Sequence, residues 1–328
     1  MLLSTHKILS KSEIPANLIK KINDCINSSN SYKTAEKFIK KNTSILVSTD
    51  QSIIEAYKKD CSNIDGSADI LVRPKNRLEC AISIYIFYKI NISITISAGR
   101  TNLTGSATPL TGAIISTEKM VTNNISIDLK NKRASCAVGT ILEDFREKVK
   151  KGSNQQLYYP VDPTSRKDAT IGGTISCNAS GFVPGNRGAT RYWVNSLSIV
   201  LTSGRIINAK RGQYVSKNGK FLIDNDIVVL PSFTRPQIKN ASGPFSFNND
   251  EVDIIDLIIG SEGIFGMIVE CELILDELPK NNLDFFVPLD NEDIAINFRN
   301  YIYKIKEKEN FIINALEYFG YNCQRYMT

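Results

Sequence analysis

Residues 160–181 read PVDPTSRKDATIGGTISCNASG. Pro160 and Pro163 make a rigid turn, while the pair Gly172-Gly173 and the later Gly181 let the backbone approach a ligand closely. Together they predict a surface on which a large flat ligand lies against the main chain. By this reasoning alone, a series of consecutive turns is equally consistent with the stretch.

Two other glycine-rich stretches lie on either side of it in the chain. Residues 97–106, SAGRTNLTGS, combine glycines, an asparagine and small hydroxyl residues, so several N–H groups are free to converge on phosphate oxygens. No Gly-Lys-Ser/Thr follows, which excludes a Walker loop, and taken alone the stretch also fits an ordinary tight turn. Residues 260–269, GSEGIFGMIV, form a glycine-rich turn leading into a strand, with Glu262 placed to orient the turn or to accept from a ligand.

Hydrophobic periodicity predicts short strands alternating with helices around these stretches. Thr140 and Glu143 have the spacing of a capping box at the start of a helix. The polar stretch 210–253 is expected to be a long excursion over the surface or the active-site mouth. The predicted strands are 69–72, 92–96, 125–129, 134–138, 197–201, 205–209 and 268–275, and the predicted helices are 77–89 and 141–150.

Composition narrows the class of protein. The chain has 328 residues, a hydrophobic fraction of 42% and a net charge of +6 spread in short lysine pairs, which gives little support to nucleic-acid binding. Seven cysteines without a C-x-x-C pair fit a reduced compartment. No signal peptide and no long apolar run is apparent, so we expect a cytoplasmic protein without a transmembrane segment, with peripheral attachment to the inner face of the membrane left open.

The three glycine-rich stretches in this order resemble the vanillyl-alcohol oxidase superfamily, whose members carry a PCMH-type FAD-binding domain. The similarity covers residues 70–278 and is greatest to the branch with glycolate oxidase, FAD-linked D-lactate dehydrogenase and D-2-hydroxyglutarate dehydrogenase. It includes RPKNRLE, AVGTILEDF, GATRYWVNSLSIVLTSGRI and DLIIGSEGIFGMIVE. It implies a two-lobed α+β FAD-binding domain of the PCMH type at 66–279 (lobes about 66–125 and 126–279), followed by the start of an incomplete α+β cap domain at 280–328. Apolar positions at helical spacing predict a helical segment at 1–65 before it.

The resemblance also implies which residues contact FAD. Those around the pyrophosphate are Ala98, Gly99, Arg100, Thr101, Asn102, Leu103, Thr104, Gly105 and Ser106. Those along the diphosphate, ribityl chain and ring are Pro160, Asp162, Pro163, Thr164, Ser165, Ile171, Gly172, Gly173, Ile175, Asn178, Ala179 and Gly181, with Gly188 and Arg191 also facing the cofactor. Those at the adenosine end are Glu262, Gly263, Gly266, Ile268 and Val269.

Some positions depart from the family. Asn102, Ser106 and Ser180 stand where many relatives have glycine, and asparagine tolerates left-handed geometry better than most residues. Several relatives attach FAD through a histidine, but the single histidine here is His6, far from the motifs, so noncovalent FAD is expected.

The substrate side of the site is less defined. In the 2-hydroxy-acid branch the cap supplies histidines as base or metal ligands, and the sequence predicts no metal site and no identified catalytic residue. Lys239 and Asn240 resemble a family segment close to flavin or substrate, although a solvated loop lysine explains Lys239 as well.

Three functions remain open. The first is oxidation of a small 2-hydroxy acid by hydride transfer to flavin N5, with an unknown electron acceptor and a cap domain that lies in a complementing chain or was lost to an early stop. The second is flavin binding without turnover, and the third, a UDP-sugar reductase, is disfavoured by the motifs. On the truncation hypothesis, this chain alone should oxidise such acids far more slowly than complete relatives, since a missing base costs about 10²–10⁴-fold.

Overall fold

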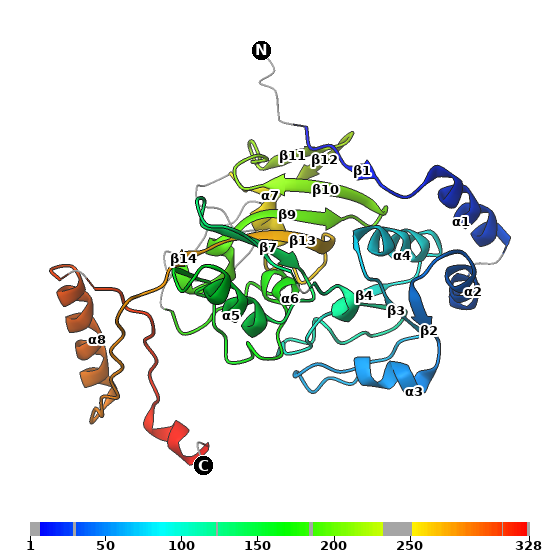
Figure 1. Cartoon of the computed structure of the whole chain (residues 1–328). Coiled ribbons are helices and arrows are strands. Elements are labelled where there is room, and N and C mark those ends of the chain that lie inside the picture. Colours follow the sequence, from blue (N-terminus) through cyan, green and yellow to red (C-terminus); the bar gives the residue numbers. More distant parts are fainter. Residues whose placement is uncertain are drawn as a thin grey trace.

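The computed structural model describes residues 7–28, 31–122, 124–183, 186–231, 251–309 and 311–326. Two main sheets form the body, with helices between and around them (Figure 1). The smaller sheet has the order β2-β3-β5-β4, in which β5 pairs in parallel with both β3 and β4. Its strands are β2 (Leu46–Ser48), β3 (Ile70–Arg73), β4 (Ile94–Ser97) and β5 (Ala113–Ser116).

The larger sheet has the order β1-β10-β9-β13-β7-β6, and all of its pairings are antiparallel. Two short two-stranded sheets, β11-β12 and β14-β8, lie beside it. The strands of the larger sheet are β1 (Lys11–Ser12), β6 (Ser126–Asp128), β7 (Arg133–Ala137), β9 (Val194–Val200), β10 (Arg205–Lys210) and β13 (Met267–Ile274). Those of the short sheets are β8 (Leu157–Tyr158), β11 (Lys220–Ile223), β12 (Asp226–Val229) and β14 (Asp276–Glu277).

Helices cover the sheets and join the two lobes. The α-helices are α1 (Ala16–Ser28), α2 (Tyr32–Asn42), α3 (Gln51–Ile54), α4 (Arg77–Lys89), α5 (Leu142–Gly152), α6 (Ile171–Ser176), α7 (Ile254–Ile258) and α8 (Glu292–Lys306). The 3₁₀ turns are η1 (Glu55–Tyr57), η2 (Thr117–Lys119), η3 (Asn186–Gly188), η4 (Thr190–Trp193) and η5 (Tyr321–Tyr326). In the described ranges, no helix is both long enough and apolar enough to cross a bilayer.

Helix α4 joins the two lobes because it packs on β5 of the smaller sheet and on β9 and β13 of the larger one. The Asn76 side chain accepts from the Glu79 N–H and so begins the helix, and Asn91 in a left-handed conformation (φ 53°) follows its end. Apolar side chains on most of its circumference are buried, as expected for a helix enclosed on several sides.

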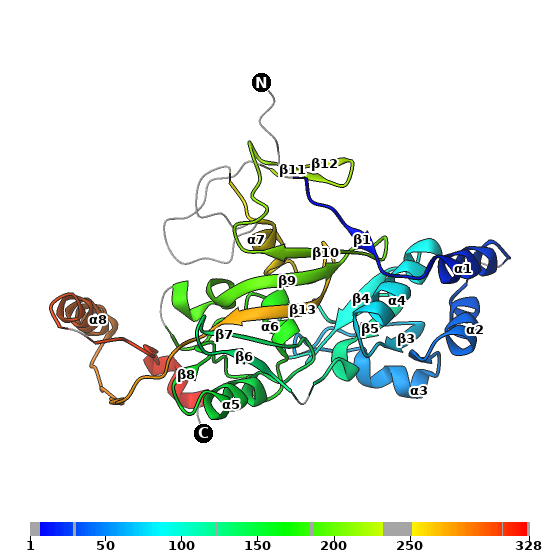
Figure 2. The same ribbon diagram turned by 45° about the horizontal axis from the view of Figure 1, so that its top comes forward.

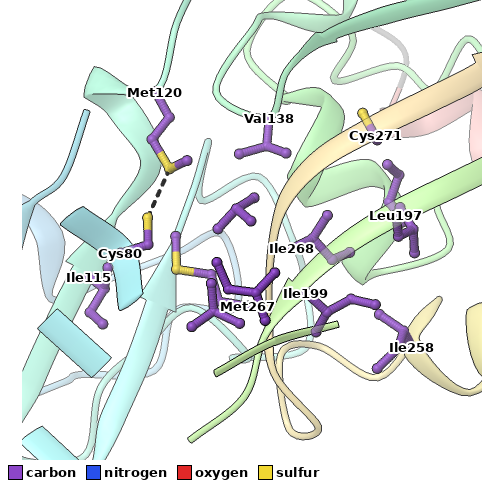
Figure 3. Packing of buried hydrophobic residues seen from close by; sticks show 14 of the residues in the cluster. Cys80, Ile115, Met120, Val138, Leu197, Ile199, Ile258, Met267, Ile268 and Cys271 are labelled. Atoms are coloured by element: carbon purple, nitrogen blue, oxygen red, sulfur yellow. Dashed lines mark hydrogen bonds between the residues drawn. The ribbon is translucent and has the colours of Figure 1, made fainter. Parts of the chain in front are cut away.

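One hydrophobic core runs across the junction of the lobes (Figure 3). From the first lobe come Cys80 and Met120, whose sulfur atoms lie 3.3 Å apart. From the second come Val138 and Met267, which are buried in the same cluster. The lobes are therefore packed against each other through apolar side chains.

Helix α5 begins differently from the sequence prediction. The N-cap residue is Ile141, and no side-chain cap bond forms, so the expected capping box of Thr140 and Glu143 is wrong. The first-turn N–H groups instead donate to backbone carbonyls of the 166–169 turn: Leu142 to Ala169 at 2.8 Å and Glu143 to Arg166 at 3.0 Å. Glu143 turns outward and pairs with Arg146. A tertiary contact thus replaced the local cap.

Most other elements match the expectations to within two or three residues at each end, and α4 matches at both. Segment 1–65 holds α1, α2 and α3, but it also supplies β1 to the larger sheet and β2 to the smaller one. Within 210–253 the structure describes the hairpin β11-β12, whereas residues 232–250 lie outside the described ranges. Helix α8 stands apart from the body in both views (Figures 1 and 2), and none of its residues is buried.

Candidate functional site

The first wall of the site is the loop that follows β4, residues 98–107. Gly99 is required because a side chain there would lie 2.3 Å from the Asp168 carbonyl oxygen. Arg100 takes a left-handed conformation (φ 55°), whereas Asn102, the residue expected to tolerate one, is not among those with positive φ. The Arg100 guanidinium lies over the Tyr57 ring, 4.9 Å from its centroid. This contact fixes a cation at the start of the loop.

The backbone of this loop keeps its donors unused. Within the described residues, the N–H groups of residues 99–106 donate no hydrogen bond, and the first loop donor in use is the Ala107 N–H. Backbone donors left unpaired in a row are suited to an anionic oxygen-rich ligand. The loop therefore has the chemistry of a diphosphate cradle.

Helix α6 forms the second wall. The Thr170 side chain accepts from the Gly173 N–H at 3.2 Å and caps the helix, and Thr174 follows one residue later on the pocket side. The pair Gly172-Gly173 has no side chains, so the helix backbone borders the pocket directly. A flat ligand can approach such a surface to van der Waals distance.

The turn after α7 closes the third side. It is attached to the end of α6, since the Gly260 N–H donates to Ile175 O at 3.1 Å and the Glu262 N–H to Ser176 O at 2.9 Å. Across the pocket, the Thr104 hydroxyl donates to Glu262 Oε1 at 3.2 Å. The turn therefore connects the two other walls.

These walls enclose one pocket that brings together parts of all three predicted stretches. The predicted residues on its lining are Ala98, Gly99, Arg100, Thr101, Asn102, Ser106, Ser165, Gly172, Gly173, Ala179, Glu262, Gly263 and Ile268. Eight further lining residues were missed: Ile96, Ala107, Thr117, Ala169, Thr170, Thr174, Ser176 and Cys177. All but Thr117 lie within or beside the quoted motifs, so only Thr117, from η2, had no local signal.

Other predicted contacts are off this lining. They are Leu103, Thr104, Gly105, Pro160, Asp162, Pro163, Thr164, Ile171, Ile175, Asn178, Gly181, Gly188, Arg191, Gly266 and Val269. Several have structural tasks: Ile171 and Ile175 are buried in the core, and Asp162 Oδ1 accepts from the Phe182 N–H at 3.0 Å. Pro160 borders a second cavity, which it shares with Tyr158, Arg187, Tyr303 and Lys306.

Arg191, which the resemblance places facing the cofactor, makes a buried ion pair in the structure. Its guanidinium donates to Asp256 Oδ1 at 3.0 Å and to the Asp256 and Ile259 carbonyl oxygens at 2.7 Å each. Asp256 also accepts from Arg211 at 2.9 Å and is 2% exposed. These hydrogen bonds hold the residues that lead into the turn at Gly260.

The ionisable side chains on the pocket lining are those of Arg100, Cys177 and Glu262. His6, Lys239 and Asn240 lie outside the described residues. In the described ranges, no cluster of three or more His, Cys, Asp or Glu could hold a metal ion. The lining thus offers one cation and many neutral donors, which fits a diphosphate-bearing cofactor.

The family comparison agrees with this chemistry. A family described as "FAD binding domain" matches residues 68–210, which span the first two walls. Residues 68–210 are thus similar to an FAD binding domain. The third wall of the pocket, at residues 260–266, lies outside the matched range.

Several curated proteins are similar to this chain over most of its length. A D-lactate dehydrogenase of Anaerostipes hadrus is 28% identical over 246 residues, 74% of this chain and 44% of its own length. A D-2-hydroxyglutarate dehydrogenase of Stutzerimonas stutzeri is 26% identical over 72% of this chain and 43% of its length. The glycolate oxidase protein GlcD of Bacillus subtilis is 27% identical over 69% of this chain and 41% of its length. The chain thus spans less than half the length of these relatives.

Solved structures share the fold. An alkyldihydroxyacetonephosphate synthase has a TM-score of 0.54 at 15% identity, covering 85% of this chain and 44% of its own. The 6-hydroxy-D-nicotine oxidase of Arthrobacter nicotinovorans has a TM-score of 0.52 at 16% identity, covering 72% and 42%. At this identity the likeness concerns the fold, which is the two-lobed, PCMH-type arrangement expected from the sequence.

Proposed function

We propose that this protein is an FAD-dependent oxidoreductase that oxidises a small 2-hydroxy acid and passes the electrons to a separate acceptor. The observation that carries the proposal is the row of unpaired N–H groups at 99–106, a stretch of which five residues line the pocket that α6 also borders. The relatives' names, a lactate, a hydroxyglutarate and a glycolate enzyme, support the substrate class. They give no support to flavin binding without turnover.

Different segments of the pocket would hold different parts of FAD. Loop 98–107 would bind the diphosphate through its N–H groups, with Arg100 offsetting part of the negative charge. Gly172 and Gly173 would lie along the flat or ribityl portion, and the turn at Glu262 would meet the adenosine end. When bound, FAD supplies a hydride acceptor at its N5 atom.

Oxidation of a hydroxyl group also requires a base for its proton. No described residue on the lining is assigned that task, and Lys239 and Asn240 stay candidates for the substrate side. The cytoplasmic location, the electron acceptor, a complementing chain and the domain boundaries at residues 65 and 279 stay predictions.

Purified protein should take up FAD and release it again on denaturation by heat or acid, since no histidine lies on the described pocket lining. Filtration after denaturation should leave the yellow colour in the filtrate. Flavin that stays with the polypeptide would contradict noncovalent binding, and a Cys177→Ser variant would then show whether that thiol is the attachment point. Failure of a well-folded protein to bind FAD would refute the proposed function.

The substrate class is tested by mixing the FAD-loaded protein anaerobically with D-lactate, glycolate or D-2-hydroxyglutarate. At least one acid should bleach the visible flavin absorbance, and dithionite serves as the control that the flavin is reducible. Bleaching by dithionite but by none of the acids would favour the alternative of a flavin-binding protein without turnover.

A further inference from the structure

Asp60 lies in the turn after η1, outside the matched FAD binding domain, yet it contacts the phosphate-facing loop at two points. Its Oδ2 atom accepts from Asn102 Nδ2 at 2.7 Å and from the Ala107 N–H at 3.2 Å. Its Oδ1 atom accepts from the Ser62 N–H at 2.9 Å, which holds the carboxylate in a local turn. One carboxylate thus joins the middle and the end of the loop.

Asn102 extends this contact to Ser106. The Asn102 amide nitrogen donates to Ser106 Oγ at 2.9 Å as well as to Asp60. An ionised carboxylate accepts hydrogen bonds only, so the amide must turn its nitrogen, with both hydrogens, toward Asp60 and Ser106. Partial burial acts to raise the pKa of Asp60, but the hydrogen bonds that it accepts outweigh burial and lower that pKa, which keeps Asp60 ionised near neutral pH.

The direction of these bonds determines what Ser106 can do. Its oxygen already accepts from Asn102, so its own hydrogen remains available for donation to a group in the pocket that Ser106 lines. Asn102, Ser106 and Ala107 line the pocket, whereas Asp60 does not, so its negative charge stays behind the loop. Asn102 and Ser106, two of the three residues that stand where many relatives have glycine, are therefore linked to each other and to this carboxylate.

We propose that Asp60 is a positioning residue for cofactor binding: through Asn102 it orients the Ser106 hydroxyl to donate to a diphosphate oxygen of FAD. The inference rests on the proposed function and adds a residue from the N-terminal segment to it. Asp60 does not touch the cofactor. It determines in which direction the side chains that touch the cofactor donate their hydrogen bonds.

The test measures FAD, ADP and riboflavin affinity of the cofactor-stripped protein and its Asp60→Asn variant. An amide at position 60 has one acceptor oxygen in place of two and no charge, so it cannot accept from Asn102, the Ala107 N–H and the Ser62 N–H together, and its hold on Asn102 weakens. We expect about tenfold weaker binding of FAD and of ADP, which is about 1.4 kcal/mol. Riboflavin has no phosphate, so its affinity should be unchanged. Asp65→Asn, an exposed aspartate of the same segment paired with Lys59, is the matched control.

A double-mutant cycle with Ser106→Ala separates positioning from a general structural role. If Asp60 acts through Asn102 and Ser106, the serine substitution should add less than about twofold to Asp60→Asn. Asn102→Ala should cause a similar loss and provides a second route should Asp60→Asn fold poorly. Independent, multiplying losses, or equal losses for riboflavin and FAD, would overturn the inference. Unchanged FAD affinity in Asp60→Asn would overturn it alone, whereas a wild-type protein that binds neither FAD nor ADP would overturn the proposed function.

Discussion

Gly173→Val should weaken FAD binding at least about a hundredfold, or about 2.8 kcal/mol, while leaving the protein folded. A Cβ atom at this position would lie 3.3 Å from both Ala98 Cβ and Thr170 Oγ1, and the two valine methyl groups would extend into the space between α6 and the loop. Gly173 lines the pocket, and under the proposed function the cofactor occupies that space. Titration of the cofactor-free protein with FAD, followed by flavin fluorescence, measures the change.

Gly152→Val is the matched control for this substitution. A glycine at the lysine-rich end of a helix is typical of a C-cap. In the structure, however, α5 includes Gly152, and the cap position is Ser153, followed by left-handed Asn154 and Gln155. A side chain at Gly152 would meet the flexible end of Ile127 at 2.6 Å, and neither Gly152 nor Ile127 lines the pocket. We expect a modest loss of thermal stability with FAD affinity preserved. Equal FAD affinities in the two folded variants would refute the assignment of Gly173 to the site.

Asp256→Ala should lower the free energy of unfolding by about 3–5 kcal/mol, because it removes the carboxylate that pairs with a buried guanidinium. The Arg191 side chain is 7% exposed and the Asp256 side chain 2% exposed, and Arg211 donates to the same carboxylate. Denaturation by urea, with and without the substitution, gives the difference. The loss should exceed that of Asp256→Asn, which keeps an acceptor oxygen.

A half-exposed ion pair provides the comparison for Asp256. Asp276 pairs with Arg187, whose side chain is 40% exposed, so Asp276→Ala should cost only about 0–1 kcal/mol. Similar losses in both alanine variants would mean that burial does not set the strength of the Asp256 cluster. In that case the turn at Gly260 would have to be held mainly by its backbone hydrogen bonds.

The sequence by itself determined the elements that local signals define. Helix α4 has a capping asparagine, apolar residues at helical spacing and a terminal asparagine close together in the chain, so its limits at Arg77 and Lys89 follow from short-range physics. The hairpin β9-β10 is likewise set by a tight turn with left-handed Gly204. The motif stretches also located most of the pocket, because the backbone approach that they permit is a property of glycine itself.

Only the tertiary structure decided which groups those elements meet. Thr140 has the spacing of a capping residue, yet the α5 donors bind carbonyl oxygens of the 166–169 turn, which pattern reading cannot place. Arg191 lies in a cofactor motif but is neutralised by Asp256, 65 residues later. Asp60 binds Asn102 across 42 residues with no local signal for the pairing. A buried donor or charge must be paired, and its partner is the group that the packing of the whole chain places beside it.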